Sequence, residues 1–586
     1  MRLLALALVV FACTVSLPAQ SSTSLDAGRA QLREAIQAEW EYNLRTNPTF
    51  ATYVGDNRYN DQLGDYSPEA VARETEHAKQ QLKLFESIDT TGFPDDEGLN
   101  QKLMVRDLRE GIEGAKFNDW QMPVNQFGGV HLGFASMPSQ MPFTSAKDYD
   151  NYIARLHQIP KALEQVTANM KLGMANQLMP PKFLLEKVTV QAQNIADATE
   201  EKSPFTQPLQ KFAASVSAAE QKRIREAVVK AVTTEVNPAY AKFAAFVKND
   251  YAPKGRTEMG VWSLPDGESR YQYEVKKLTT TGFTPEQIHQ MGLKQVAELD
   301  AQMLAIAKAQ GYADVKSFNQ HIRQDPKLHG NSAEQILGLY QHYTDQMYTK
   351  LPQLFGRLPK NKLAVVPMEA FRAPDSVPAD YSPGTADGSR PGRINVNEYD
   401  PTHRLLLNVE AIAYHEGVPG HHLEYSISSE LTTIPPFRKY SWFPAFSEGW
   451  ALYSERLGKD VGFYQDPYSE YGRLGNEMWR SIRLVVDTGV HYKHWTRELM
   501  VQYFRDHTAM DEPNIQTEVD RYIAWPAQAL SYKLGQMEIL ALREQAKTDL
   551  GVKYDIKSFH DEVLSAGPLP LEVLRTRVTE WIAKQK

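Results

Sequence analysis

Three histidines and a glutamate lie close together in the last third of the chain. The segment reads His415-Glu416-Gly417-Val418-Pro419-Gly420-His421-His422. A zinc hydrolase needs two neutral imidazoles and a carboxylate as ligands, an open position for water, and a second carboxylate that moves protons. These residue types indicate a zinc site in which His415 is a ligand and Glu416 takes a proton from water.

The spacing differs from the usual His-Glu-x-x-His motif, whose two histidines share one helix face. Here the second imidazole follows six or seven residues after the first. An unbroken helix is excluded, because Pro419 lacks an N–H and its ring clashes with the carbonyl of His415. Gly420 supplies the freedom for a bulged turn that could bring His421 back toward the metal. We favour His421 as the second ligand; His422 is the alternative.

A second helix, predicted over residues 446–455, offers the remaining carboxylates. Glu448 and Glu455 are seven residues apart and therefore lie on one helix face. Glu448 is the nearer of the two and is expected to complete the metal site. Glu455 is expected to hold a ligand imidazole through its other ring nitrogen. The plain alternative is a surface histidine–glutamate pair without metal, but the number of ligands in these two segments favours the metal site.

The elements around this site are predicted from the spacing of apolar residues. Helical periodicity covers residues 24–113, 146–248, 284–358 and 402 to the end, with a capped helix start at Thr284-Pro285-Glu286-Gln287. Residues 121–142 are rich in Gly, Pro, Met and Phe and predict a long ordered loop over a surface or cleft, where it could line a substrate site.

Residues 362–396 contain short strand patterns, Leu363–Pro367 and Ile394–Asn397. The predicted fold is mainly α, a large multi-helical body with a small β-sheet before the active-site helix. We expect an N-terminal helical region over 24–360 and a metal-site catalytic region over 361–586, joined in one continuous multi-lobed body.

The start of the chain predicts export. Met1-Arg2 is followed by an apolar run from Leu3 to Ala12, which is typical of a signal peptide over residues 1–19. The alternative is a lipoprotein signal ending before Cys13, the chain's one cysteine. We therefore expect a periplasmic or secreted protein, or an outer-membrane-anchored lipoprotein whose only membrane contact is a lipid on Cys13. A net charge of −8 offers no broad basic face, so nucleic acid is not an expected partner.

Four stretches resemble the bacterial domain of unknown function 885 family, whose members are regarded as relatives of gluzincin peptidases. They are Tyr414–Glu424, Phe446–Glu455, Arg483–Thr496 and Arg521–Gly535. The resemblance is specific over the C-terminal third and, by helical layout, extends to the whole mature chain. It implies a gluzincin-like body with a deep cleft, one Zn²⁺ per chain and a peptide substrate. The Gly-His pair of related metallopeptidases also points to His421.

The downstream stretches supply candidates for the remaining roles. An oxyanion needs hydrogen-bond donors, and we rank Tyr532 and His491 ahead of Tyr492 and His494. Three further residues could bind a substrate carboxylate: Arg521, Gln528 and Lys533. The structural alternative is that His491 belongs to a helical charge ladder and that the cations are solvated or structural.

The sequence therefore predicts an exported zinc peptidase in which Glu416 is general base and then general acid, with carboxypeptidase-like cleavage as one form. One alternative is a non-catalytic cell-envelope binding protein or lipoprotein on the same fold. Another is a zinc amidase that acts on a non-peptide amide.

Overall fold

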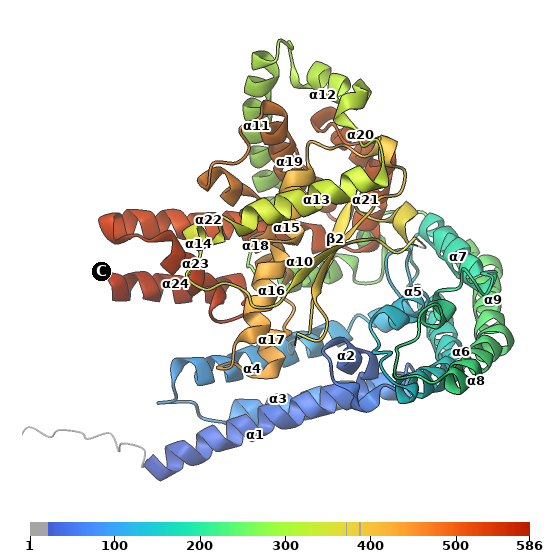
Figure 1. Cartoon of the computed structure of the whole chain (residues 1–586). Coiled ribbons are helices and arrows are strands. Elements are labelled where there is room, and N and C mark those ends of the chain that lie inside the picture. The colour runs from blue at the N-terminus through green and yellow to red at the C-terminus, as the bar shows by residue number, and fades with distance from the viewer. Residues whose placement is uncertain (1–21, 371, 386–387) are drawn as a thin grey trace, which may run out of the picture.

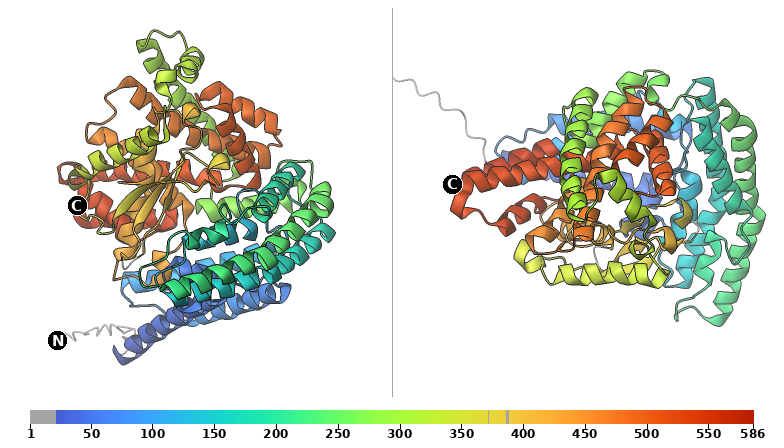
Figure 2. Two further views of the ribbon diagram at one scale, coloured as in Figure 1. Left: turned by 45° about the vertical axis from the view of Figure 1, so that its right-hand side comes forward. Right: turned by 90° about the horizontal axis from the view of Figure 1, so that it is seen from above.

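Helices form most of the chain, as the apolar spacing predicts, and the only strands described form one small sheet. The structure is a computed structural model that describes residues 22–370, 372–385 and 388–586. The predicted signal peptide over 1–19 and Cys13 lie outside the described residues. Figures 1 and 2 show a lower layer of blue helices, a flank of teal and green helices, and an upper body that holds the sheet and the C-terminal helices.

The lower layer is built from the first helices. They are α1 (Ser22–Thr46), α2 (Pro48–Tyr53), α3 (Pro68–Ser87) and α4 (Asp95–Ala115). Buried side chains such as Ile36, Phe85 and Met104 join α1, α3 and α4 into one small core. The helical prediction for residues 24–113 is confirmed.

The flank consists of the next group of helices. They are α5 (Val130–Ser136), α6 (Ala146–Ala175), α7 (Lys182–Ala196), α8 (Ala218–Ala231) and α9 (Asn237–Phe246). The loop predicted over 121–142 is wrong in part, because it contains α5, whose Phe134 and Ala135 are buried in the core of the flank. The high glycine and proline content of this segment predicts a loop, although its apolar residues form a helix that packs in the core.

The middle of the chain links the flank to the upper body. It contains α10 (Gly267–Thr279), α11 (Pro285–Ala309), α12 (Val315–Gln324), α13 (Ala333–Tyr348) and α14 (Leu351–Leu354). The helix start predicted at Thr284 is confirmed: its hydroxyl accepts a hydrogen bond from the Gln287 N–H, and the Gln287 side chain accepts one from the Thr284 N–H.

The sheet has three strands in the order β1-β3-β2. They are β1 (Leu363–Pro367), β2 (Ala379–Ser382) and β3 (Gly392–Val396). β3 pairs parallel with β1 and antiparallel with β2. Ile394 and Val396 of β3 are fully buried against Ile412 and Ala413. The two predicted strands are confirmed, and the sheet packs against the helix that carries the first histidine.

The remaining helices complete the upper body. They are α15 (Val409–Glu416), α16 (His421–Glu430), α17 (Pro436–Lys439), α18 (Pro444–Asp460), α19 (Pro467–His491), α20 (Arg497–His507), α21 (Glu512–Ala524), α22 (Ser531–Leu550), α23 (Ile556–Leu564) and α24 (Leu571–Gln585). α11 packs along α19, and α18 packs along α22. No helix in the described ranges is both long and apolar enough to cross a membrane.

Candidate metal centre

The histidine segment is a complete break between two helices. α15 ends at Glu416, α16 begins at His421, and the Val418–Pro419 peptide between them is cis. The prediction of a bulge within one helix is therefore corrected. A Cβ on Gly420 would lie 2.0 Å from the carbonyl oxygen of His415, so the tight connection requires glycine at this position.

The connection is held from α18. Trp450 Nε1 donates to the carbonyl of Pro419 at 2.9 Å, and the Ser454 hydroxyl donates to the same carbonyl at 3.2 Å. Both donors are buried. The helix that carries Glu448 therefore also fixes the path of the chain between the two histidines.

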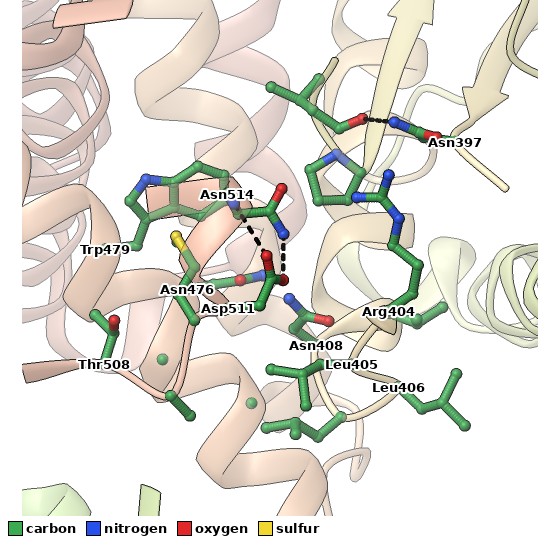
Figure 3. Close-up of a pocket in the computed structure, with 18 of the residues that line it drawn as sticks. Asn397, Arg404, Leu405, Leu406, Asn408, Asn476, Trp479, Thr508, Asp511 and Asn514 are labelled. Carbon is green, nitrogen blue, oxygen red and sulfur yellow. Dashed lines mark hydrogen bonds between the residues drawn. The ribbon is translucent and has the colours of Figure 1, made fainter. Parts of the chain in front are cut away.

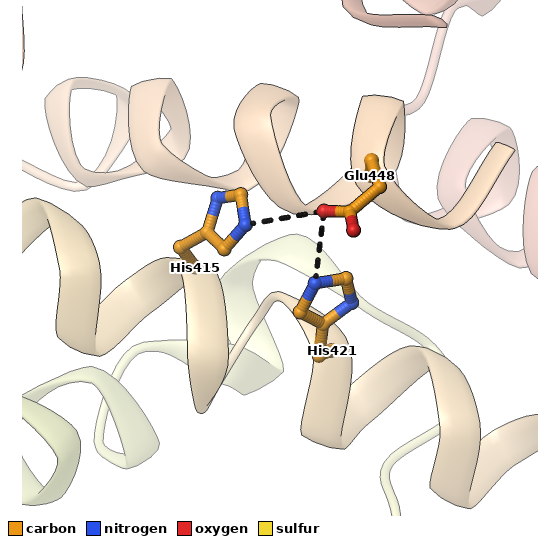
Figure 4. A group of neighbouring side chains, drawn as sticks. All are labelled: His415, His421 and Glu448. Atoms are coloured by element: carbon orange, nitrogen blue, oxygen red, sulfur yellow. Dashed lines mark ion pairs between the residues drawn. The ribbon is translucent and has the colours of Figure 1, made fainter. Parts of the chain in front are cut away.

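His415, His421 and Glu448 converge on one point (Figure 4). Glu448 Oε2 lies 3.6 Å from His415 Nε2 and 3.3 Å from His421 Nε2, and the two imidazole planes are perpendicular. Burial would raise the pKa of Glu448, but hydrogen bonds with the two histidines hold it well below its usual range. Among the residues that the structure describes, this is the one group of three such side chains that could hold a metal ion.

Glu455 orients the first imidazole. Its Oε1 lies 2.9 Å from His415 Nδ1, and both side chains are almost completely buried. Arg480 lies 3.7 Å from the same carboxylate oxygen. The contact between Glu455 and Nδ1 leaves His415 Nε2 directed at Glu448. In metal sites, a carboxylate in this position fixes the tautomer of a ligand histidine.

The neighbouring His422 faces away from this point. Its Nδ1 lies 3.1 Å from the Tyr381 hydroxyl, and its Nε2 lies 3.2 Å from the carbonyl oxygen of Asn361. The ring is fully buried, and burial lowers its pKa to about 4. The structure therefore brings His421, rather than the alternative His422, to Glu448.

The donor set fits a zinc ion. Two imidazole nitrogens and one carboxylate oxygen are the ligands of a catalytic zinc site, and bonds of about 2.1 Å in tetrahedral geometry separate such atoms by about 3.4 Å. The distances of 3.3 and 3.6 Å from Glu448 match this separation. His421 Nδ1 is buried with no hydrogen-bond partner in the described part of the chain.

Glu416 lines a large cavity together with His415, His421 and Glu448. Burial raises the pKa of its carboxyl to about 8, with the negative charge of Glu448 adding to the rise and His421 opposing it. The sequence predicts a proton-transferring role for this residue, and its side chain lies where a substrate could reach it.

The cavity has a volume of about 1090 Å³ and is bounded by distant parts of the chain. Gln126, Phe127 and Leu132, from the segment 121–142, form part of one wall. Gln126 Nε2 donates to the carbonyl of Asp520 at 3.0 Å, which joins this wall to α21. The cavity is large enough to enclose several residues of a peptide.

Tyr532 and Arg521, both predicted from the sequence, line this cavity. The Tyr532 ring stacks on His415 with centroids 6.2 Å apart, and its hydroxyl accepts a hydrogen bond of 2.9 Å from Arg521. Arg521 also donates to Gln528 Oε1 at 2.9 Å. Gln528 is buried outside the cavity lining, so it positions Arg521 and does not itself face a substrate.

Two other predicted residues are not brought to the site. His491 is buried, accepts a hydrogen bond from the Val261 N–H at Nδ1 and lies 2.9 Å from the Tyr522 carbonyl through Nε2. Burial lowers its pKa to about 3. Lys533 is buried between Glu477 and Gln536, 2.8 Å from each. Neither lines the cavity, so the structure does not place these two residues where the predicted oxyanion and carboxylate-binding roles would need them.

Sequence reasoning missed several residues on the cavity wall, among them Tyr381, Tyr425 and Arg480. Tyr425 follows His421 by four residues on α16, and its ring centroid lies 6.1 Å from that imidazole. Helical spacing from the ligand could have identified it. Arg480 could have been found in the same way, three residues before Arg483. Tyr381 belongs to β2, which had no sequence signal of its own.

The fold and the site define a class of protein: a large helical body with a histidine–glutamate cluster on the wall of a deep cavity. The chain belongs to the family described as bacterial protein of unknown function (DUF885), which matches residues 48–578. None of the curated proteins compared with the chain matches it.

Solved structures similar to the chain include two bacterial proteins. One is the crystal structure of a candidate lipoprotein from Colwellia psychrerythraea, 28% identical, with a TM-score of 0.89 over 96% of this chain and 99% of that one. The other is a candidate lipoprotein of unknown function from Shewanella oneidensis, 18% identical, with a TM-score of 0.68 over 93% of this chain and 99% of that one. The second likeness shows the fold alone.

Proposed function

We propose that this protein is an exported zinc-dependent peptidase of the gluzincin type, in which a downstream helix contributes the ligand glutamate. One observation carries the proposal: His415, His421 and Glu448 converge beside Glu416 on the wall of a cavity of about 1090 Å³. A bound zinc ion would lower the pKa of a water molecule and polarise the scissile carbonyl.

The protein's own groups then move the protons and hold the substrate. Glu416 takes a proton from water and passes it to the leaving amine. The Tyr532 hydroxyl accepts a hydrogen bond from Arg521, so its own proton is free to be donated to the developing oxyanion. Glu455 keeps His415 in the ligand orientation.

The cationic part of the cavity wall favours an anionic end on the substrate. Arg480, Arg483 and Arg521 all line the cavity. Their acidic partners are Glu455, which is shared with His415, and Glu518, which lies 2.9 Å from Arg483. A peptide carboxylate is the natural partner for the remaining positive charge, which supports carboxypeptidase-like cleavage.

The start of the chain and the relatives support a location in the cell envelope. The apolar run before Cys13 suits an export signal, and two similar structures are described as candidate lipoproteins. We infer that the protein acts in the cell envelope, either free in the periplasm or anchored by a lipid on Cys13.

The test is Glu416→Gln, with cleavage of a peptide library and zinc content measured on the same preparation. We expect about one zinc ion per chain to be retained and the rate of cleavage to fall about 10²- to 10⁴-fold, because the amide cannot accept the proton. Glu498→Gln, on the exposed surface of α20, is the matched control and should cleave at the original rate. Unchanged cleavage by Glu416→Gln would exclude the proposed role of this residue.

A second candidate is a non-catalytic binding protein or lipoprotein of the cell envelope; the description of the two similar structures as candidate lipoproteins supports the envelope location. It predicts peptide binding without cleavage by the unmodified protein. It also predicts that Glu416→Gln leaves peptide binding unchanged and that the variant, like the unmodified protein, cleaves nothing. Zinc content and product formation, measured together, separate the two candidates.

A further inference from the structure

Tyr425 differs from its neighbours on α16 in its exposure. Residues 421–424 and 426–428 of this helix are buried, whereas Tyr425, between them, is only half-buried. It lines the large cavity together with Glu416. The exposed part of the Tyr425 side chain therefore faces the same cavity as the candidate metal centre.

The place of Tyr425 on the helix brings it next to a candidate ligand. Tyr425 follows His421 by four residues, so the two side chains lie on one face of α16. Their ring centroids are 6.1 Å apart. The phenol is therefore a direct neighbour of the second imidazole of the site.

The hydroxyl of Tyr425 is a donor without a protein acceptor. It makes no hydrogen bond within the part of the chain that the structure describes. The neighbouring Tyr381 differs, because its hydroxyl lies 3.1 Å from His422 Nδ1. The Tyr381 ring centroid is 5.8 Å from that of Tyr425, so this ring supports the Tyr425 ring. A phenol that is packed along its ring and unpaired at its tip is free to donate to a group in the cavity.

The wall that carries Tyr381 is held in place from outside the cavity. Residues 376–381 line the cavity. The Asn397 side chain is buried and donates to the carbonyls of Ala373 at 2.7 Å and of Ser376 and Val377 at 3.2 Å each. Figure 3 shows Asn397 bonded to this segment at the edge of a second, smaller pocket. The surroundings of the Tyr425 ring are therefore formed before a ligand binds.

A phenol thus lies beside each imidazole of the candidate metal centre. Tyr532 of α22 stacks on His415, with ring centroids 6.2 Å apart, and Tyr425 of α16 lies beside His421. Both tyrosines line the cavity. A substrate carbonyl that reaches the two histidines through the cavity can therefore meet a hydroxyl donor beside either of them.

We propose that the Tyr425 hydroxyl is a second donor to the oxyanion, from the His421 side of the site, while Tyr532 donates from the His415 side. The inference rests on the proposed peptidase function and adds a catalytic residue to it. Preorganised donors stabilise the charge that develops on the carbonyl oxygen during acyl transfer, and they bind the transition state more strongly than the substrate. The Tyr425 hydroxyl keeps its proton throughout the reaction.

The kinetic test is Tyr425→Phe, which keeps the ring and removes only the unpaired hydroxyl. The variant should fold and retain about one zinc ion per chain, because no ligand is changed. We expect kcat to fall about 10²- to 10³-fold and KM to change less than about threefold, because the lost hydrogen bond belongs to the transition state. Tyr348→Phe, at the end of α13 and outside the cavity lining, is the matched control and should keep both values. Near-ultraviolet circular dichroism and zinc content confirm that each variant is folded.

A binding measurement gives a result that does not depend on cleavage. A phosphonate peptide carries tetrahedral anionic oxygens in place of the scissile amide. Tyr425→Phe should raise its Kd about 10- to 100-fold, the range for a lost hydrogen bond to a charged group. The matching amide peptide is titrated against Glu416→Gln with and without Tyr425→Phe, and its Kd should change less than about threefold.

The outcomes separate this inference from the proposed function. Cleavage at the original rate by folded Tyr425→Phe would exclude the second donor. Equal weakening of the phosphonate and the amide peptide, loss of zinc from Tyr425→Phe, or no binding of the phosphonate by the unmodified protein would exclude it as well. If the unmodified protein cleaves no peptide but its binding of the phosphonate depends on Tyr425, the peptidase is excluded and the donor remains.

Discussion

Adjacent histidines in this chain have opposite environments. His421 points at Glu448 and has an unpartnered Nδ1, whereas both nitrogens of His422 lie within hydrogen-bonding distance of protein groups. We expect His421→Ala to abolish retention of zinc, because it removes one of three ligands, and His422→Ala to keep about one zinc ion per chain. Zinc is measured by mass spectrometry after dialysis.

The two variants should also differ in their free energy of unfolding. His422→Ala removes a buried ring and leaves the Tyr381 hydroxyl without this partner, so it should cost about 2–4 kcal/mol of unfolding free energy. His421→Ala should cost less when metal is absent. Loss of zinc from His422→Ala, with zinc retained by His421→Ala, would reverse the assignment of the ligand.

At the scale of single residues, the sequence predicts which residue types form the site better than it predicts where their side chains point. His415, Glu416 and Glu448 are predicted from their spacing and lie together in the structure. From the sequence, His421 is only favoured over His422, because the path of the chain after a helix break depends on hydrogen bonds to Pro419 from residues 31 and 35 positions away, Trp450 and Ser454. Helical periodicity says nothing about such contacts.

At the scale of elements, the crossing of α18 and α22 depends on two glycines. A Cβ on Gly535 would lie 1.8 Å from the carbonyl oxygen of Ala445, and a Cβ on Gly449 would lie 2.4 Å from the Cα of Gly535. The two helix backbones are therefore in direct contact beside Glu448. Gly449 directly follows Glu448 on α18, so this close approach fixes the part of α18 that carries Glu448.

Gly535→Ala should force α18 and α22 apart. We expect a loss of about 1–3 kcal/mol of unfolding free energy from overpacking, against a gain of at most about 1 kcal/mol from helix propensity, and weaker retention of zinc. Thermal unfolding and zinc titration measure the two effects. Gly338→Ala, where the added Cβ meets nothing within 4 Å, isolates the propensity gain and should unfold no earlier than the original protein. Equal behaviour of the two variants would show that the crossing tolerates a side chain.

Most elements are predictable from the sequence because their cause is local. The capped start at Thr284 and the strands at residues 363–367 and 394–396 carry their signals within a few residues. α19 is different. It buries charged residues along its length, including Arg473, Glu477 and Arg483, which pair with one another or with side chains of other helices. In the sequence these charges resemble an exposed ladder, and only tertiary packing reveals them as core.

At the scale of the whole molecule, the cavity exists because distant regions meet. Lys187 of α7 forms an ion pair of 2.6 Å with Asp520 of α21, and Arg497 of α20 lies 2.7 Å from the same carboxylate. The N-terminal and metal-site regions therefore build one site together. A metal at His415, His421 and Glu448 would join α15, α16 and α18 within it.

Chelation should therefore lower the thermal stability of the whole protein. A ligand present at 1,000 times its Kd stabilises the native state by about 4 kcal/mol, so we expect removal of zinc to lower Tm by several degrees. Differential scanning calorimetry with and without a chelator measures the shift, and added zinc should restore it. His421→Ala should show no response to the chelator. An unchanged Tm in the original protein would mean that no metal links these helices.

The Asn397 side chain has a thermodynamic consequence for recognition. The Asn397 side chain donates to three carbonyls of the segment 373–377, whose Ser376 and Val377 line the large cavity, so this part of the wall is already ordered before any ligand arrives. Binding then carries little conformational entropy cost on the protein side, so affinity depends on the fit of the ligand and on the order that the ligand itself loses. Short peptides with restricted backbones should gain the most from such a preorganised surface.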